Sequence, residues 1–171
     1  MKKMEELGRE AFGDLLTDPR AMAFWWPRFK RLSEWFLNQL VRGKADISEI
    51  RTEVNGEIEI STANGPIILS AKADRIDVMT SRQACIIDYK TGMAPPRIAV
   101  TSGYAPQLSL EGVILKLGGF SQLPPLEVEK LAYWKVTGGT PAGEIISFVG
   151  TDKMPTAELI SAAERGVRNL F

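Results

Sequence analysis

The stretch from Ala73 to Thr91, ADRIDVMTSRQACIIDYKT, decides the fold because it holds two apolar segments separated by a short polar run. The segments are Ile76 to Val78 and Ala84 to Ile87, and the run between them, residues 80–83, is suited to a hairpin turn. The pattern predicts two adjacent strands.

The second of these strands ends in charged residues. It is apolar at four consecutive positions, as in a strand buried on both faces, yet it runs into Asp88-Tyr89-Lys90. Side chains alternate faces along a strand, so Asp88 and Lys90 point the same way, and Asp74 on the preceding strand can join them.

Two carboxylates that converge within about 4 to 6 Å repel each other unless a cation lies between them. Hard oxygen ligands suit Mg²⁺ or Mn²⁺, so the pattern indicates a metal-dependent phosphodiesterase site. A salt-bridged strand end is the alternative for any isolated Asp-x-Lys.

A third strand precedes these two. From Ile50 onward, polar and apolar residues alternate as in a half-buried strand, and Asn64-Gly65 is typical of a hairpin turn. The partner strand runs from Pro66 to Val78. The three strands are therefore predicted to form an antiparallel meander.

Helices are predicted on both sides of this meander in the sequence. Residues 4–16 have the spacing of an amphipathic helix, and Asp18-Pro19 is typical of an N-cap followed by the first helical residue. Pro27 disfavours continuation of that second helix, and a longer helix follows over residues 29–43. We interpret its aromatic stripe as core. The later elements are a mobile loop over residues 93–102, a helix over 104–117, strands over 131–136 and 144–149, and a helix over 152–171.

Composition limits the function classes. The 171 residues are 44% hydrophobic, enough for one core and one domain, with N-terminal helices over residues 1–45 and the main body over 50–171. Lys plus Arg equals Asp plus Glu at 21 each, so no general basic field attracts nucleic acid. The absence of histidine excludes histidine catalysis and His-ligated zinc. The single cysteine, Cys85, excludes an internal disulfide and a four-cysteine iron–sulfur cluster in this chain, and we expect a buried, inert thiol.

The helical patterns at both ends start or stop in mid-register, so we expect a piece of a longer protein. No signal peptide or long apolar run is visible, which predicts a soluble, cytoplasmic location.

Three motifs together resemble a known family. Asp74, then Asp88-Tyr89-Lys90 after thirteen residues, resembles the PD-(D/E)XK nuclease signature in its RecB-type form. Gly103-Tyr104-Ala105-Pro106-Gln107-Leu108 resembles the Y-x-x-Q-L start of the helix after the catalytic strands. With Phe24-Trp25-Trp26-Pro27-Arg28-Phe29, the chain is most similar to the carboxyl-terminal nuclease domains of AddB subunits of AddAB helicase-nucleases.

The resemblance implies an α/β (α+β) restriction-endonuclease-like core, in which helices flank a central mixed sheet. It implies Mg²⁺- or Mn²⁺-dependent exonucleolytic hydrolysis of single-stranded DNA in double-strand break repair and recombination, with an AddA-type helicase subunit as partner. The implied catalytic residues are Asp74, Asp88, Lys90 and Gln107. The implied metal ligands are Asp74, Asp88 and the backbone carbonyl of Tyr89. Further site candidates are Glu53 and Glu111, and the DNA-contact candidates are Lys72, Arg75, Arg97 and Tyr104.

The chain departs from the family pattern at two places. Glu111 stands where the family commonly has tyrosine, and the upstream histidine motif is absent. The alternative function is a catalytically inactive module that keeps the nuclease fold for DNA or subunit docking. An unrelated α/β binding domain is a third interpretation, but it leaves the glutamine helix motif unexplained.

Overall fold

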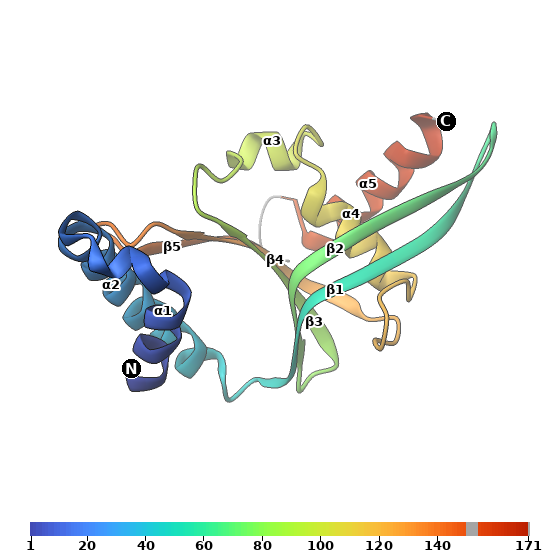
Figure 1. Cartoon of the computed structure of the whole chain (residues 1–171). Helices are drawn as coiled ribbons and strands as arrows, with labels where there is room; N and C mark the ends of the chain where they lie inside the picture. Colours follow the sequence, from blue (N-terminus) through green and yellow to red (C-terminus); the bar gives the residue numbers. More distant parts are fainter. Residues whose placement is uncertain (150–153, 171) are drawn as a thin grey trace. The chain divides into compact units, whose positions relative to one another are not determined.

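The computed structural model describes residues 1–149 and 154–170. Its five strands form one mixed sheet in the order β1-β2-β3-β4-β5, flanked by helices (Figure 1). The strands are β1 (Ile47–Thr62), β2 (Gly65–Met79), β3 (Gln83–Lys90), β4 (Glu127–Val136) and β5 (Gly143–Val149). The helices are α1 (Lys2–Phe12), the 3-10 helix η1 (Gly13–Thr17), α2 (Pro19–Gly43), α3 (Arg97–Thr101), α4 (Gln107–Lys116) and α5 (Thr156–Leu170). The predicted fold class, helices around a mixed sheet, is confirmed.

The chain divides into two compact units. The first contains residues 1–45, 90–93 and 134–145, so the N-terminal helices lie in it together with one end of the β4–β5 pair. The second contains residues 46–89, 94–133 and 146 onward. No helix in the described part of the chain has the length and apolar character needed to cross a membrane.

The predicted antiparallel meander is confirmed. β1 and β2 pair along almost their whole lengths and meet at Thr62 and Gly65, around the predicted turn at Asn64-Gly65. β2 and β3 pair antiparallel through four residues, from Arg75 opposite Ile87 to Val78 opposite Ala84. β1 begins three residues before the predicted Ile50, because the N-terminal end of the strand also pairs with β2.

Glu53 marks a change of face in β1. Up to Arg51 the odd-numbered residues are the less exposed ones, whereas from Val54 onward the even-numbered residues are. Thr52 and Glu53 are both exposed, and Glu53 has a φ of 55°, in the left-handed region that residues other than glycine rarely adopt. This local backbone geometry shifts the alternation by one residue, so the even-numbered residues Val54 and Ile60 of the same strand enter the core.

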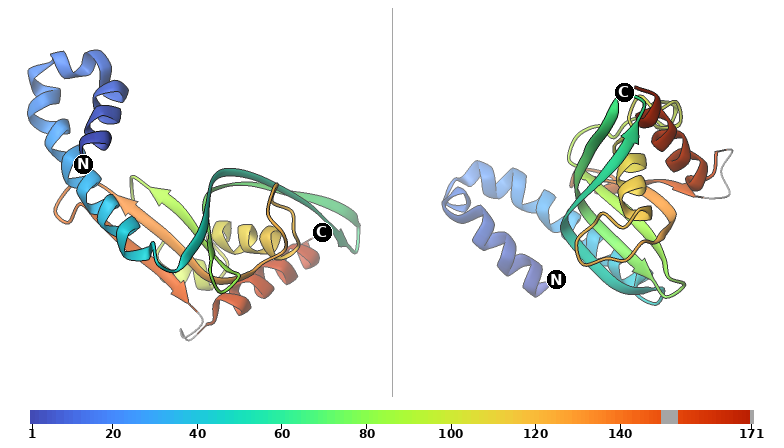
Figure 2. Two further views of the ribbon diagram at one scale, coloured as in Figure 1. Left: turned by 90° about the horizontal axis from the view of Figure 1, so that it is seen from below. Right: turned by 90° about the vertical axis from the view of Figure 1, so that its right-hand side faces the viewer.

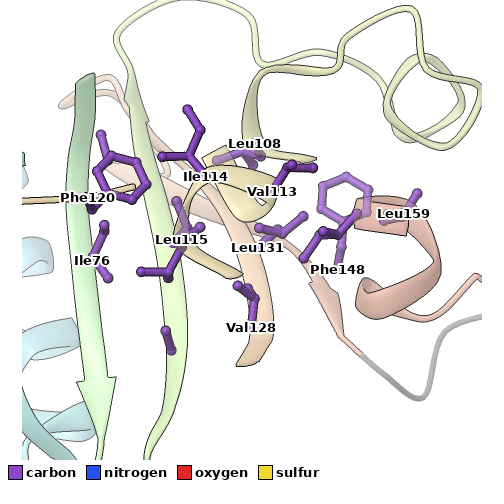
Figure 3. Packing of buried hydrophobic residues seen from close by; sticks show 14 of the residues in the cluster. Ile76, Leu108, Val113, Ile114, Leu115, Phe120, Val128, Leu131, Phe148 and Leu159 are labelled. Atoms are coloured by element: carbon purple, nitrogen blue, oxygen red, sulfur yellow. The ribbon is translucent and has the colours of Figure 1, made fainter. Parts of the chain in front are cut away.

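The core of the second unit lies between the sheet and two helices. α4 and α5 pack against each other and against the β1–β2 hairpin (Figures 1 and 2). Close packing of the two helices needs a glycine, because a Cβ at Gly112 of α4 would lie 2.7 Å from Cδ1 of Ile160 in α5. Figure 3 shows side chains of this core, which include Ile76, Leu108, Ile114, Phe120, Leu131 and Phe148.

The predicted break at Pro27 is wrong. The Asp18 carboxylate caps the helix by accepting the Arg20 backbone N–H at 2.8 Å, but α2 then continues through Pro27 to Gly43. Proline lacks the N–H that would bond the carbonyl of Ala23, and because Ala23 is exposed, water can replace that bond. Aromatic packing across the proline also favours continuity, since Trp26 and Phe29 stack with ring centroids 5.4 Å apart.

Other boundaries also differ from prediction, and α4 begins at Gln107 rather than at 104. The first helix ends at Phe12 and η1 follows it, and the loop predicted over residues 93–102 contains the short helix α3. β4 begins at Glu127 rather than 131. The predicted start of the last helix at 152 and its predicted end at 171 lie outside the described residues, and α5 is described from Thr156.

Candidate active site

Asp74 is bound to the neighbouring strand. Its Oδ2 accepts a hydrogen bond of 2.9 Å from the backbone N–H of Tyr89 in β3. The last pair of the β2–β3 register is Arg75 with Ile87, so Asp74 and Asp88 are the next residues on their two strands. The register therefore brings the two predicted metal ligands to the same level of the sheet.

Asp88 is held from α4. Its side chain is buried, with the residue only 3% exposed, and Oδ1 accepts a 2.5 Å hydrogen bond from Nε2 of Gln107. The same Gln107 nitrogen donates to Oε1 of Glu111, one turn further along the helix, at 3.2 Å. Gln107 thus joins the buried carboxylates of Asp88 and Glu111.

Tyr133 is a member of this cluster that sequence reasoning missed. It lies fully buried in β4, where burial first and then the negative charges of Asp88 and Glu111 raise the pKa of its phenol to about 12. Its hydroxyl group therefore stays protonated at neutral pH. The apolar sequence around Tyr133 indicates only a buried strand, so no local signal links it to residues far away in the chain.

Lys90 and Tyr89 keep their predicted places on the strand. Lys90 is the last residue of β3, two residues after Asp88, which is same-face spacing on a strand. Tyr89 uses its backbone N–H to bond Asp74. The catalytic role of Lys90 and the metal contact of the Tyr89 carbonyl stay predictions.

Arg75 has an internal partner instead of the predicted phosphate contact. It is 2% exposed and forms a bidentate ion pair with Asp77, with Nε–Oδ1 and Nη2–Oδ2 distances of 2.6 and 2.7 Å. Nη1 of Arg75 also donates to the Tyr89 hydroxyl at 3.4 Å. A buried guanidinium in such a pair cannot reach DNA without leaving a buried carboxylate uncompensated. Through the Tyr89 hydroxyl, Arg75 instead links β2 to β3 beside Asp74 and Asp88.

Glu53 and Lys72 form an exposed ion pair with each other. Glu53 lies at the level of Asp74, between the β1–β2 pairs Thr52–Arg75 and Val54–Ala73. Both side chains of the ion pair are accessible to solvent, so either can exchange its partner at little cost.

The two remaining DNA-contact candidates are both exposed, but only Arg97 is described with a partner inside the protein. Arg97 donates from Nη2 to the carbonyl of Ser147 at 2.7 Å and lies over the Phe148 ring, so it attaches α3 to β5. Tyr104 is 89% exposed, three residues before Gln107.

The profile of the PD-(D/E)XK nuclease superfamily matches residues 3–171. The chain belongs to the PD-(D/E)XK nuclease superfamily. A nuclease-type fold accounts for the placement of Asp74 and Asp88 on adjacent strands, with Gln107 of α4 bound to Asp88.

Relatives of this PD-(D/E)XK chain occur in Rickettsia. It is 29% identical over 130 residues to an uncharacterized protein of Rickettsia bellii (strain RML369-C), covering 68% of this chain and 16% of the relative. It is 32% identical over 97 residues to uncharacterized protein RT0391 of Rickettsia typhi (strain ATCC VR-144 / Wilmington), covering 57% of this chain and 11% of the relative. The chain thus spans less than a fifth of the length of these relatives. Among solved structures, the one titled "Crystal structure of SSO0001" is similar with a TM-score of 0.42 and 13% identity, covering 86% of this chain and 67% of the other.

PD-(D/E)XK nucleases typically use divalent metals, and the residues of this chain fit an ion that keeps part of its water shell. Within residues 1–149 and 154–170, no group of three or more His, Cys, Asp or Glu side chains is arranged to hold a metal. The described residues therefore form no cage of three or more such side chains. Mg²⁺, however, commonly keeps several waters and takes one or two protein carboxylates together with substrate phosphate oxygens. Asp74 and Asp88 supply two such carboxylates.

Proposed function

We propose that the chain is a metal-dependent deoxyribonuclease domain that hydrolyses phosphodiester bonds of single-stranded DNA. The observation that carries the proposal is the pair of anchored carboxylates. Asp74 is bound to the backbone of β3 and Asp88 to Gln107 of α4, at adjacent places in the strand register. Hydrogen bonds of this kind fix carboxylates in one orientation, which favours a defined site over a flexible acidic surface.

Each residue has a role in this proposal. Bound Mg²⁺ or Mn²⁺ would lower the pKa of a water molecule and polarise the phosphoryl oxygen. Asp74 and Asp88 would hold the ion, with the Tyr89 carbonyl as a further oxygen donor. Gln107 keeps Asp88 in place, and Glu111 orients the Gln107 amide so that its nitrogen faces Asp88. Lys90 would orient the nucleophile or stabilise negative charge as it grows on phosphorus.

The parent protein that we propose is an AddB-like subunit of a helicase-nuclease for double-strand break repair and recombination in the cytoplasm. The motifs around Phe24 and Gln107 support this proposal, as does the length of the relatives, which leaves room for other domains. An AddA-type helicase subunit would feed single-stranded DNA into the nuclease. Such delivery raises the local DNA concentration and replaces intrinsic affinity, which this chain of balanced charge does not supply generally.

A second candidate function is a non-catalytic docking module with the nuclease fold. The lack of a third metal-ligating side chain in the described part of the chain favours it. The two candidates differ in whether Asp88 is needed for cleavage.

The deciding experiment is a nuclease assay of the parent complex with end-labelled DNA and Mg²⁺. We expect Asp88→Ala to abolish cleavage of one strand while helicase motion continues, because hydrolysis loses a metal carboxylate. The exposed Asp14 provides a matched control, and Asp14→Ala should cleave as the wild type does. Undiminished cleavage of both strands by Asp88→Ala would support the docking module. The isolated chain should cleave slowly, since it lacks the motor that delivers DNA.

A further inference from the structure

An aromatic groove lies on the N-terminal helices. It is a cavity of about 470 Å³ whose lining includes Leu15, Asp18, Arg20, Phe24 and Trp25. Phe24 and Trp25 are 56% and 54% exposed, and Leu15 is 64% exposed. Aromatic rings exposed to this extent beside another exposed apolar side chain are uncommon on a surface without a binding role.

The rings of this groove are fixed in orientation. Phe24 and Trp25 meet edge to face, with centroids 5.3 Å apart. Cζ of Arg28 lies 4.6 Å from the Phe24 centroid and 5.8 Å from the Trp25 centroid, within the range of cation–π contacts. The next residue, Trp26, turns inward and is only 7% exposed, so it anchors this part of α2. The groove therefore presents rigid aromatic surfaces that lose little conformational entropy when a ligand binds.

Positive charge borders the rings. The Arg20 side chain is 92% exposed and pairs with Asp18 at 3.0 Å, and the Arg28 guanidinium lies over the Phe24 ring. Asp18 repels an anionic ligand, but the two arginines outnumber its single negative charge. An exposed ion pair such as Asp18–Arg20 contributes little stability, so the Arg20 guanidinium can turn to a phosphate.

We propose that this groove binds single-stranded nucleic acid, with a base stacked on Trp25 and the adjoining phosphates on Arg20 and Arg28. Surfaces that bind single strands without sequence preference combine exposed aromatic rings with basic groups in this way. An apolar protein partner would use the rings but would leave the two arginines without a counter-charge. The choice of nucleic acid as ligand class rests on the proposed function, whereas the groove lies on residues that take no part in the predicted chemistry.

Tryptophan fluorescence tests the proposal without any cleavage. The probe is oligodeoxythymidine, added to the 171-residue chain in EDTA at low salt. Trp26 and Trp134 are buried and Trp35 packs edge to face on Trp134, so Trp25 is the tryptophan that a base can reach and quench. We expect DNA to quench the fluorescence of the wild type. Trp25→Phe should lose the quenching but still bind, as measured by the fluorescence anisotropy of labelled DNA. Trp25→Ala should bind at least about tenfold more weakly than the wild type.

Two further variants separate stacking from charge. Arg20→Gln should lower the salt dependence of binding, because one phosphate contact is lost. Val41→Ala is the matched control, since Val41 is a 72% exposed apolar residue of the same helix outside the groove, and it should bind as the wild type does.

Two outcomes would overturn the inference. One is equal DNA binding by Trp25→Ala and the wild type. The other is an absence of quenching together with self-association that Trp25→Ala removes, which would make the groove a protein contact. The assay contains EDTA, so it reports DNA binding whether or not the chain cleaves DNA. A lack of nuclease activity would refute the proposed catalysis, whereas quenching in the same chain would leave this inference standing.

Discussion

The backbone N–H of Tyr89 donates a 2.9 Å hydrogen bond to Oδ2 of Asp74. This bond connects the side chain of one predicted metal ligand to the residue that directly follows the other, Asp88. The carboxylate of Asp74 is therefore held by the strand that carries Asp88. A shift of either strand would change the position of the two carboxylates relative to each other.

The bond separates two roles of Asp74, because asparagine keeps the acceptor but not the charge. We expect Asp74→Asn to change the free energy of unfolding by less than about 1 kcal/mol. Its affinity for Mn²⁺ should fall at least about tenfold, since the ion loses a carboxylate ligand. Isothermal titration with Mn²⁺ and urea unfolding measure the two quantities, with Asp14→Asn as control. Wild-type Mn²⁺ affinity in Asp74→Asn would remove this residue from the site.

Much of the meander and of the site follows from local sequence. Asn64-Gly65 determined the hairpin, and the charges at Asp88 and Lys90 after an apolar run indicated the strand end where the site lies. The pairing of Arg75 with Asp77 was also within reach, because residues two apart on a strand share a face. A basic residue beside the predicted site also suggests a phosphate contact, and that interpretation overlooks the ion pair.

Other features depend on contacts that no local pattern reports. The continuity of α2 through Pro27 depends on the aromatic packing around Trp26. Tyr133 joins Asp88 and Glu111 only because β4 is placed beside β3 in the sheet. The change of face at Glu53 requires a backbone conformation that glutamate does not favour.

That conformation gives a stability prediction. A left-handed residue other than glycine costs about 1 kcal/mol or more, and asparagine tolerates this region better than glutamate. We expect Glu53→Asn to raise the free energy of unfolding by about 0.5–1 kcal/mol, less any small contribution of the exposed Lys72 pair. Glu57→Asn, an exposed change on the same strand, should be neutral or destabilising. Chemical denaturation compares them, and equal effects would show that Glu53 is not strained.

The α4–α5 contact predicts opposite effects for the same substitution at two glycines. Gly112→Ala should destabilise by about 1–3 kcal/mol, because its Cβ would meet Ile160. Gly166→Ala in α5 has nothing within 4 Å and should stabilise by about 0.5–1 kcal/mol through helix propensity. Thermal unfolding decides between them. A harmless Gly112→Ala would mean that the two helices are not closely packed.

Cys85 gives a prediction on pH. Burial, the largest cause, raises the pKa of its thiol from 9.0 to about 12, and the unfolded chain has the ordinary value. The pKa of the thiol is higher in the folded state than in the unfolded state. The contribution of the buried thiol to the free energy of unfolding is therefore complete below pH 9 and is lost as pH rises toward 12. The stability difference between the wild type and Cys85→Ala should therefore be constant from pH 7 to 9 and shrink above pH 9. Urea unfolding across this range measures it, and a constant difference up to pH 11 would show that the thiol is accessible to solvent.

Anomalous diffraction from a crystal of this chain soaked in Mn²⁺ tests the shared metal site most directly. We expect one strong peak between the carboxylates of Asp74 and Asp88, with oxygen distances of about 2.1 Å, and no peak in Asp88→Ala. A peak elsewhere, or none in a fully soaked wild-type crystal, would contradict the claim that these two carboxylates share a metal.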